Sequence, residues 1–178
     1  MGGPTSGMGV SLWLVPEGPA RELLSGCIHR LAERLGTVPF APHVTLLAGI
    51  EAGEEVALAE AEALARTLAP LPVRLAGVEG RDARFRCLYV RAEHPAALAA
   101  AHAVAARWFS RDPDPSFEPH LSLVYGTLEP EAKAGLAREL DAATRVSFEV
   151  RRLHLWRTAG EPEEWSEIGA FGLGGGSD

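Results

Sequence analysis

The sequence has few cysteines, no long apolar run and fewer basic than acidic residues. Cys27 and Cys87 are the two cysteines among 178 residues; they form no CxxC pair, so a thiolate metal site is unsupported. Two free, buried thiols are the expected state, and a disulfide between them is the alternative. The apolar runs fall short of the roughly 18 residues that cross a bilayer. The start, Met1 to Met8, lacks the basic and apolar regions of a secretion signal. We therefore expect a cytoplasmic protein.

The charge balance argues against a long nucleic acid as ligand. Lys and Arg number 17 against 24 Asp and Glu, which gives a formal net charge of −7. Proteins that bind long RNA or DNA need a basic surface that releases counterions. A small ligand is therefore favoured, although Arg81, Arg84 and Arg86 could form a local basic patch in one pocket. We expect no membrane partner and a monomer.

The hydrophobic pattern predicts a single α+β domain. Apolar residues make up 47% and charged residues 23%, as in ordinary globular proteins. Apolar spacing predicts helices at 20–35, 54–68, 95–109 and 130–140, and strands at 10–15, 43–50, 73–78, 85–91, 120–126, 145–157 and 165–171. The expected domain covers residues 9–172, between a flexible leader (1–8) and a flexible tail (173–178).

An internal repeat divides the chain. Residues 40–47, Phe-Ala-Pro-His-Val-Thr-Leu-Leu, match residues 117–124, Phe-Glu-Pro-His-Leu-Ser-Leu-Val, at an offset of 77 residues. This period is too long for a solenoid. It predicts a duplicated lobe, in which antiparallel strands are backed by helices and the two lobes face a central groove.

The repeated motif carries acid–base chemistry. Side chains alternate faces along a strand, so His43 and Thr45 point one way, as do His120 and Ser122, while the leucines and valines between them pack on helices. Two imidazoles can serve as base for an attacking water and as acid for a leaving oxygen at phosphorus. The two hydroxyls can donate to the non-bridging oxygens. A lone His-x-Thr is weak evidence, but two copies within one repeat favour a catalytic site.

At these residues the sequence resembles the two-histidine (2H) phosphoesterases, and within them the plant and yeast cyclic phosphodiesterases. The narrower resemblance also rests on residues 11–16, Ser-Leu-Trp-Leu-Val-Pro, on residues 85–87, Phe-Arg-Cys, and on Tyr125. It implies a bilobal fold and hydrolysis, without metal or cofactor, of nucleoside 2′,3′-cyclic phosphates to 2′-phosphates or of ADP-ribose 1″,2″-cyclic phosphate. It further implies that Trp13 and Phe85 flank the base or the ribose.

Three assignments stay open in the sequence. Trp13 shares a strand face with Ser11, which favours a site residue over a core tryptophan. Strand parity turns Tyr125 away from His120 unless the strand's end reorients it. Trp13 and Phe85 both lie in the first half of the sequence, outside the second motif's lobe. If they hold the nucleoside, its leaving oxygen falls nearer one histidine, and we expect His120 as the base and His43 as the acid.

The remaining histidines and tryptophans are expected to have surface or packing roles. His29 and His102 are expected on a helix surface or in helix packing, and His154 at the groove or in solvent; Trp108 and Trp165 are expected to pack the core or the lobes.

Two other functions compete with cyclic phosphodiester hydrolysis. One is an enzyme related to 2′-5′ RNA ligases or acting on cyclic oligonucleotides. The other is a module that binds a mononucleotide without turnover.

Overall fold

The computed structural model describes residues 9–175, which form an α+β fold as predicted. Eight strands make an antiparallel sheet: β1 (Val10–Leu14), β2 (Val44–Ile50), β3 (Leu71–Glu79), β4 (Leu88–Glu93), β5 (His120–Val124), β6 (Val146–Val150), β7 (Arg152–Arg157) and β8 (Ser166–Gly172). The helices are α1 (Gly18–Leu35), α2 (Glu54–Thr67), α3 (Ala96–Trp108) and α4 (Pro130–Leu140). Short 3-10 turns are η1 (Arg84–Arg86), η2 (Pro162–Glu164) and η3 (Leu173–Gly175).

The sheet divides into two lobes at its centre. Its strand order is β6-β3-β4-β5-β2-β1-β7-β8. The central strands β2 and β5 meet at the registered pair Val44 and Leu121. We call β2, β1, β7 and β8 the His43 lobe, and β5, β4, β3 and β6 the His120 lobe. Each lobe has four strands, so the repeat does mark a duplicated architecture.

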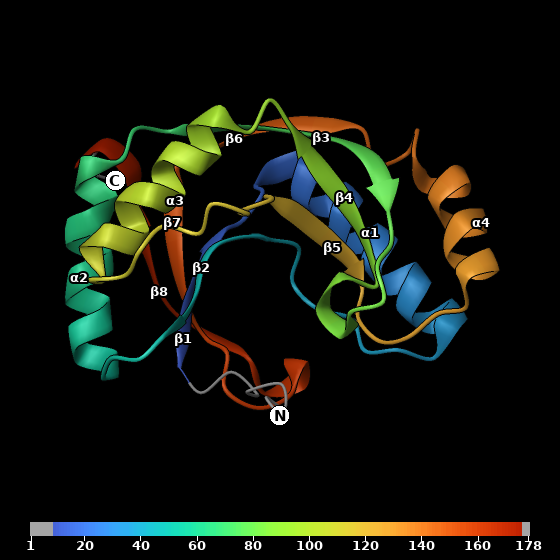
Figure 1. Cartoon of the computed structure of the whole chain (residues 1–178), viewed down its shortest axis with the longest axis horizontal. Coiled ribbons are helices and arrows are strands. Elements are labelled where there is room, and N and C mark those ends of the chain that lie inside the picture. Colours follow the sequence, from blue (N-terminus) through green and yellow to red (C-terminus); the bar gives the residue numbers. More distant parts are fainter. Residues whose placement is uncertain (1–8, 176–178) are drawn as a thin grey trace.

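The lobes are not the two halves of the sequence. The His120 lobe takes its strands from the middle of the chain, whereas the His43 lobe joins the first two strands to the last two (Figure 1). The reason is that β1 pairs with β2 on one side and with the distant β7 on the other. Phe85 therefore lies in the lobe of the second motif, and the expectation that it lies outside that lobe is wrong.

Two predicted strands differ from those observed. Residues 145–157 were expected to form one strand, but the chain breaks at Arg151, and β6 and β7 pair at opposite ends of the sheet, with β3 and β1. No glycine or proline marks this crossing between lobes, so the sequence pattern runs through it unbroken. Phe85 lies not in a strand but in η1, and β4 begins at Leu88.

Each lobe has its own pair of helices. Helices α2 and α3 pack beside the His43 lobe, and α1 and α4 beside the His120 lobe (Figure 1). The core lies between helices and sheet and includes Val44, Leu46, Leu121 and Leu123. We call the opposite face of the sheet, which carries the candidate catalytic residues, the site face.

Two side chains differ from their predicted burial. Trp108, expected to pack the core or the lobes, is exposed, and its indole N–H donates to Glu60 on α2 (2.7 Å). Leu173, expected in the tail, is buried against the core and begins the turn η3, which ends at Gly175. The rest of the expected tail and leader lies outside the described residues.

The two cysteines and the apolar helices were the features for which composition gave an expectation. Cys27 and Cys87 are free and buried, as predicted, and burial raises the pKa of both thiols. In the part of the chain that the structure describes, no helix is both long and apolar enough to cross a bilayer.

Candidate active site

The four candidate catalytic side chains converge where the lobes meet. His43 precedes β2 and His120 begins β5, the two central strands. Continued one residue either way from the registered pair Val44 and Leu121, the antiparallel ladder would place His43 opposite Ser122 and Thr45 opposite His120. Directly opposed residues of antiparallel strands have Cβ atoms about 5 Å apart. The fold thus brings together the residues that the repeat predicts.

Both imidazoles are held in the same way. The Nδ1–H of His43 donates to the carbonyl oxygen of Ala41 (2.7 Å), and the Nδ1–H of His120 donates to that of Glu118 (2.8 Å). A carbonyl oxygen can only accept, so each bond fixes the proton on Nδ1. Each ring therefore keeps Nε2 for chemistry. The intervening prolines, Pro42 and Pro119, stiffen both approaches.

Burial sets the electrostatics of the pair. His43 is 6% exposed, and its pKa is lowered to about 4, mainly by burial and to a smaller extent by His120, while the hydrogen bond to the Ala41 carbonyl opposes this shift. The pKa of the partly buried His120 is also lowered, first by burial and then by Arg86 and Arg81. Both rings thus favour the neutral form in the absence of an anion. A phosphate bound between them would favour their charged forms.

Each catalytic-site histidine ring contacts an aromatic ring from the neighbouring strand. Trp13 of β1, in register with Thr45, stacks on His43 with ring centroids 3.4 Å apart. Tyr89 of β4, in register with Ser122, meets His120 edge-on at 5.1 Å. Sequence reasoning missed Tyr89. Its position in the sheet is what identifies it, because β4 lies next to β5 in one lobe as β1 lies next to β2 in the other.

Trp13 has little ring surface left for a ligand. It also stacks on Trp156 at 4.3 Å, and 2% of it is exposed. The observed role of Trp13 is to support the His43 ring. Its contact with a base or ribose stays a prediction.

Ser122 links the site to η1 and to Tyr125. Its hydroxyl donates to the carbonyl oxygen of Phe85 (2.8 Å). Burial raises the pKa of Tyr125, and its hydrogen bond with Ser122 opposes that rise. Strand β5 ends at Val124, which frees Tyr125 from the strand's alternation. The strand's end therefore reorients this side chain toward Ser122.

A second aromatic group spans the two lobes. Phe85, which is 44% exposed, meets Tyr125 edge-on at 5.2 Å and lies 5.9 Å from Trp165. Trp165 also contacts Trp13 at 5.8 Å. Trp165 therefore bridges the lobes, as one of its two interpretations predicted. An ion pair between Arg84 and Glu161 joins the same two segments, η1 and the β7–β8 connection.

The other histidines take structural positions. His154 lies on the site face, in register with Trp13, but is buried, and its Nδ1 lies 2.9 Å from a Glu167 carboxylate oxygen. His102 is buried rather than on a surface, whereas His29 is exposed and bonds the Ser25 carbonyl oxygen (2.8 Å). Within residues 9–175, no three His, Cys, Asp or Glu side chains gather as a metal site would require.

The curled antiparallel sheet, with paired His-x-Thr and His-x-Ser strands at its centre, defines the 2H phosphoesterase class. The sequence model of the 2′-5′ RNA ligase superfamily matches residues 28–162, and the chain belongs to this superfamily. The broader of the two predicted resemblances is confirmed. Membership makes the chain an enzyme that acts on phosphodiesters.

Solved structures show the same fold. TT0787 of Thermus thermophilus is 22% identical with a TM-score of 0.62, over 93% of this chain and 98% of that one. E. coli LigT in apo form is 16% identical with a TM-score of 0.62, over 92% and 96%. LigT complexed with 3′-AMP is 14% identical with a TM-score of 0.58, over 92% and 96%. No curated protein sequence gives a significant match.

Proposed function

We propose that the protein hydrolyses a cyclic phosphodiester on a ribose without a metal ion. The substrate is a nucleoside 2′,3′-cyclic phosphate, opened to the 2′-phosphate, or ADP-ribose 1″,2″-cyclic phosphate, opened to the 1″-phosphate. One observation carries the proposal: two imidazoles, each fixed through Nδ1 by a carbonyl and free at Nε2, flank one strand junction together with two hydroxyls.

The reaction is an in-line displacement at phosphorus. One Nε2 takes a proton from water as the new P–O bond forms, and the other Nε2 gives a proton to the ribose oxygen as its P–O bond breaks. The hydroxyls of Thr45 and Ser122 donate to the non-bridging oxygens. Ser122 must turn its hydroxyl from the Phe85 carbonyl to do so. Each proton transfer accounts for about 10² to 10⁴ in rate.

The buried environment favours His43 as the base. The pKa of His43 is lowered to about 4, so this ring is neutral and able to accept a proton at neutral pH. His120 is more exposed and is left as the acid once the substrate's negative charge favours its protonated form. This assignment is the reverse of the one expected from sequence, which had no measure of burial.

A mononucleotide bound to a protein of the same fold and an exposed aromatic ring both support a small nucleotide as the substrate. E. coli LigT, which shares the fold, is complexed with the mononucleotide 3′-AMP. Phe85 is exposed, its backbone carbonyl accepts from Ser122, and its ring meets Tyr125 edge-on. An aromatic face beside a phosphate site suits a nucleobase, and such stacking contributes about 1 to 3 kcal/mol.

The test is incubation with adenosine 2′,3′-cyclic phosphate in excess EDTA. We expect turnover to adenosine 2′-phosphate that EDTA leaves intact, because the described residues gather no metal-ligand set. Loss of activity in EDTA with recovery on added zinc or manganese would contradict the mechanism. Binding without turnover would indicate a nucleotide-binding module, and turnover confined to 2′-5′-linked RNA would indicate the ligase-like alternative.

A further inference from the structure

The two motif histidines have the same backbone support but different side chains beside it. Ala41 and Glu118 occupy matching positions in the repeat, two residues before His43 and His120. The carbonyl oxygen of each accepts the Nδ1–H of its histidine, at 2.7 and 2.8 Å. The side chain of Ala41 is a methyl group, whereas Glu118 places a carboxylate next to the second histidine. The two copies of the motif therefore differ in charge at one defined position.

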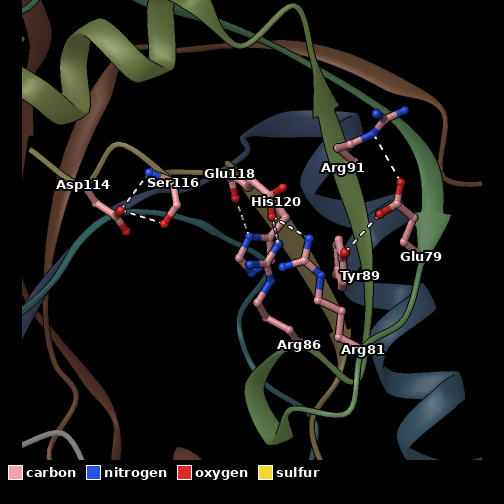
Figure 2. Close-up of polar contacts among 9 residues, drawn as sticks. All are labelled: Glu79, Arg81, Arg86, Tyr89, Arg91, Asp114, Ser116, Glu118 and His120. Atoms are coloured by element: carbon pink, nitrogen blue, oxygen red, sulfur yellow. Dashed lines mark hydrogen bonds and ion pairs between the residues drawn. The ribbon is translucent and has the colours of Figure 1, made fainter.

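Two arginines bind the Glu118 carboxylate. The backbone N–H of Arg81 donates to the carbonyl oxygen of Arg86 (3.1 Å), which closes the loop between them. The Nη2 atoms of both arginines donate to the same Glu118 oxygen, at 2.6 and 3.0 Å. Figure 2 shows both guanidinium groups reaching toward Glu118, beside His120. We call Arg81, Arg86 and Glu118 the charged clamp.

The Tyr89 ring joins the charged clamp to His120. Arg86 lies over this ring at 4.9 Å and Arg81 at 6.0 Å from its centroid, while His120 meets the ring edge-on at 5.1 Å. Tyr89 is buried, and its hydroxyl donates to Glu79 (3.0 Å). Cations are attracted to the face of an aromatic ring. A fixed ring thus holds both guanidinium groups near the histidine.

The charges of the clamp do not cancel. Two arginines and one carboxylate leave one net positive charge. The other titratable or charged groups that face His120 are Tyr89, the ion pair of Arg91 with Glu79, and His43 across the site. Burial lowers the pKa of His120, Arg86 and Arg81 lower it further, and the carbonyl and carboxylate of Glu118 oppose them. The net charge of the clamp therefore disfavours a protonated ring while no anion is bound.

We propose that Arg81, Arg86 and Glu118 position His120 and control its uptake of a proton, so that this ring becomes the acid when a phosphate is bound. The negative charge of the substrate offsets the net positive charge of the clamp and then favours the protonated ring. His43 has no counterpart to the clamp, since Ala41 stands in the place of Glu118. The clamp thereby gives the two copies of one motif different roles. This inference rests on the proposed hydrolysis and names the residues that regulate its acid.

An NMR titration of His120 tests the clamp without turnover. Arg86→Gln removes a positive charge and should raise the pKa of His120, and Arg81→Gln should act in the same direction. Glu118→Gln removes a negative charge but keeps the backbone carbonyl, and it should lower this pKa. Arg86→Lys keeps the charge and should leave the pKa close to that of the unmodified protein. Shifts of the same sign in Arg86→Gln and Glu118→Gln, or no shift in either, would overturn the clamp.

The pH dependence of kcat/KM is the second measurement. Its alkaline limb follows the protonated acid, so Arg86→Gln should move this limb to higher pH and Glu118→Gln to lower pH. Arg34→Gln is the matched control, because Arg34 also donates to a carboxylate, Glu139, but on the outer helices; it should leave the limb in place.

The two measurements separate the clamp from the reaction and from direct binding of substrate. If no cyclic phosphate is hydrolysed but the NMR titrations shift with the expected signs, the clamp stands and the proposed reaction fails. Calorimetry with adenosine 2′-phosphate supplies the remaining comparison. If Arg81→Gln and Arg86→Gln weaken the binding of this nucleotide and leave the titration of His120 unchanged, the arginines contact the substrate and the clamp is refuted.

Discussion

His43 and His120 are each fixed at Nδ1 and free at Nε2, which makes their removal the sharpest single-residue test. We expect His43→Ala and His120→Ala each to lower kcat by at least about 10²-fold, because each loses a proton-transfer group. Steady-state assays with a 2′,3′-cyclic nucleotide measure this, with circular dichroism to confirm folding. Turnover near that of the unmodified protein in either folded variant would refute the mechanism.

The lowered pKa values of both histidines predict an acidic optimum. As pH falls through about 4, His43 becomes protonated and can no longer act as base, so kcat/KM should fall. As pH rises through the pKa of His120, which lies below its ordinary 6.5, the acid loses its proton and kcat/KM should fall again. A pH series of kcat/KM should show a bell between these limits, whose apparent values belong to the coupled pair. A maximum of kcat/KM above pH 6.5 would contradict this prediction.

Single residues were predictable where the reason is local. Alternation along a strand places His43 and Thr45 on one face whatever the rest of the chain does. Tyr89 and the buried state of Trp13 depend on which strands become neighbours, and that pairing is set by contacts far apart in sequence. The reorientation of Tyr125 depended on where β5 ends, which sequence leaves uncertain by a few residues.

Among the larger elements, the connection between α3 and β5 positions the second motif. His102 on α3 holds this connection: its Nδ1–H donates to the Leu46 carbonyl oxygen (2.8 Å), and its Nε2 accepts from the Asp114 backbone N–H (3.1 Å). The ring also stacks on Phe117 at 4.0 Å. His102 thereby ties β2 to the segment that leads into β5.

Replacing His102 should destabilise the fold. His102→Leu leaves the carbonyl of the buried Leu46 without its hydrogen bond from His102, at about 1 to 3 kcal/mol, and removes the bond that holds the exposed Asp114 N–H. Urea unfolding should show this loss in the free energy of unfolding. His29→Leu is the control, since His29 is exposed on α1, and it should change stability by about 0.5 kcal/mol or less. Equal stability of the two variants would show that the connection does not depend on His102.

The helices followed from sequence because their signals are local. Helix α4 begins and ends as predicted, with Pro130 in its first turn. The crossing at Arg151 did not follow, because β6 and β7 separate only when each finds its partner strand in a different lobe. Local propensity is the same on both sides of the break.

The whole molecule is built from two lobes that exchange chain segments. After β6 in the His120 lobe, the chain crosses over and forms β7 and β8 in the His43 lobe. Helix α1, which follows β1 of the His43 lobe, packs against β5 of the His120 lobe. The site lies at the junction and takes one histidine from each lobe. The repeat predicted two lobes and a shared site, but it could not show this exchange, since a repeat is equally compatible with two independent halves.

This exchange predicts that the lobes unfold together. The tryptophans Trp13 and Trp156 lie in the His43 lobe, so tryptophan fluorescence reports mainly on it, while far-UV circular dichroism reports on the whole chain. Leu75 is buried in β3 of the other lobe, and Leu75→Ala should cost about 2 to 5 kcal/mol. We expect urea midpoints by fluorescence and by circular dichroism to fall together. Leu155→Ala, in β7, is the matched control within the His43 lobe and should behave alike. A fluorescence midpoint that stays unchanged in Leu75→Ala while the dichroism transition splits would mean that the lobes fold independently, despite the strands they exchange.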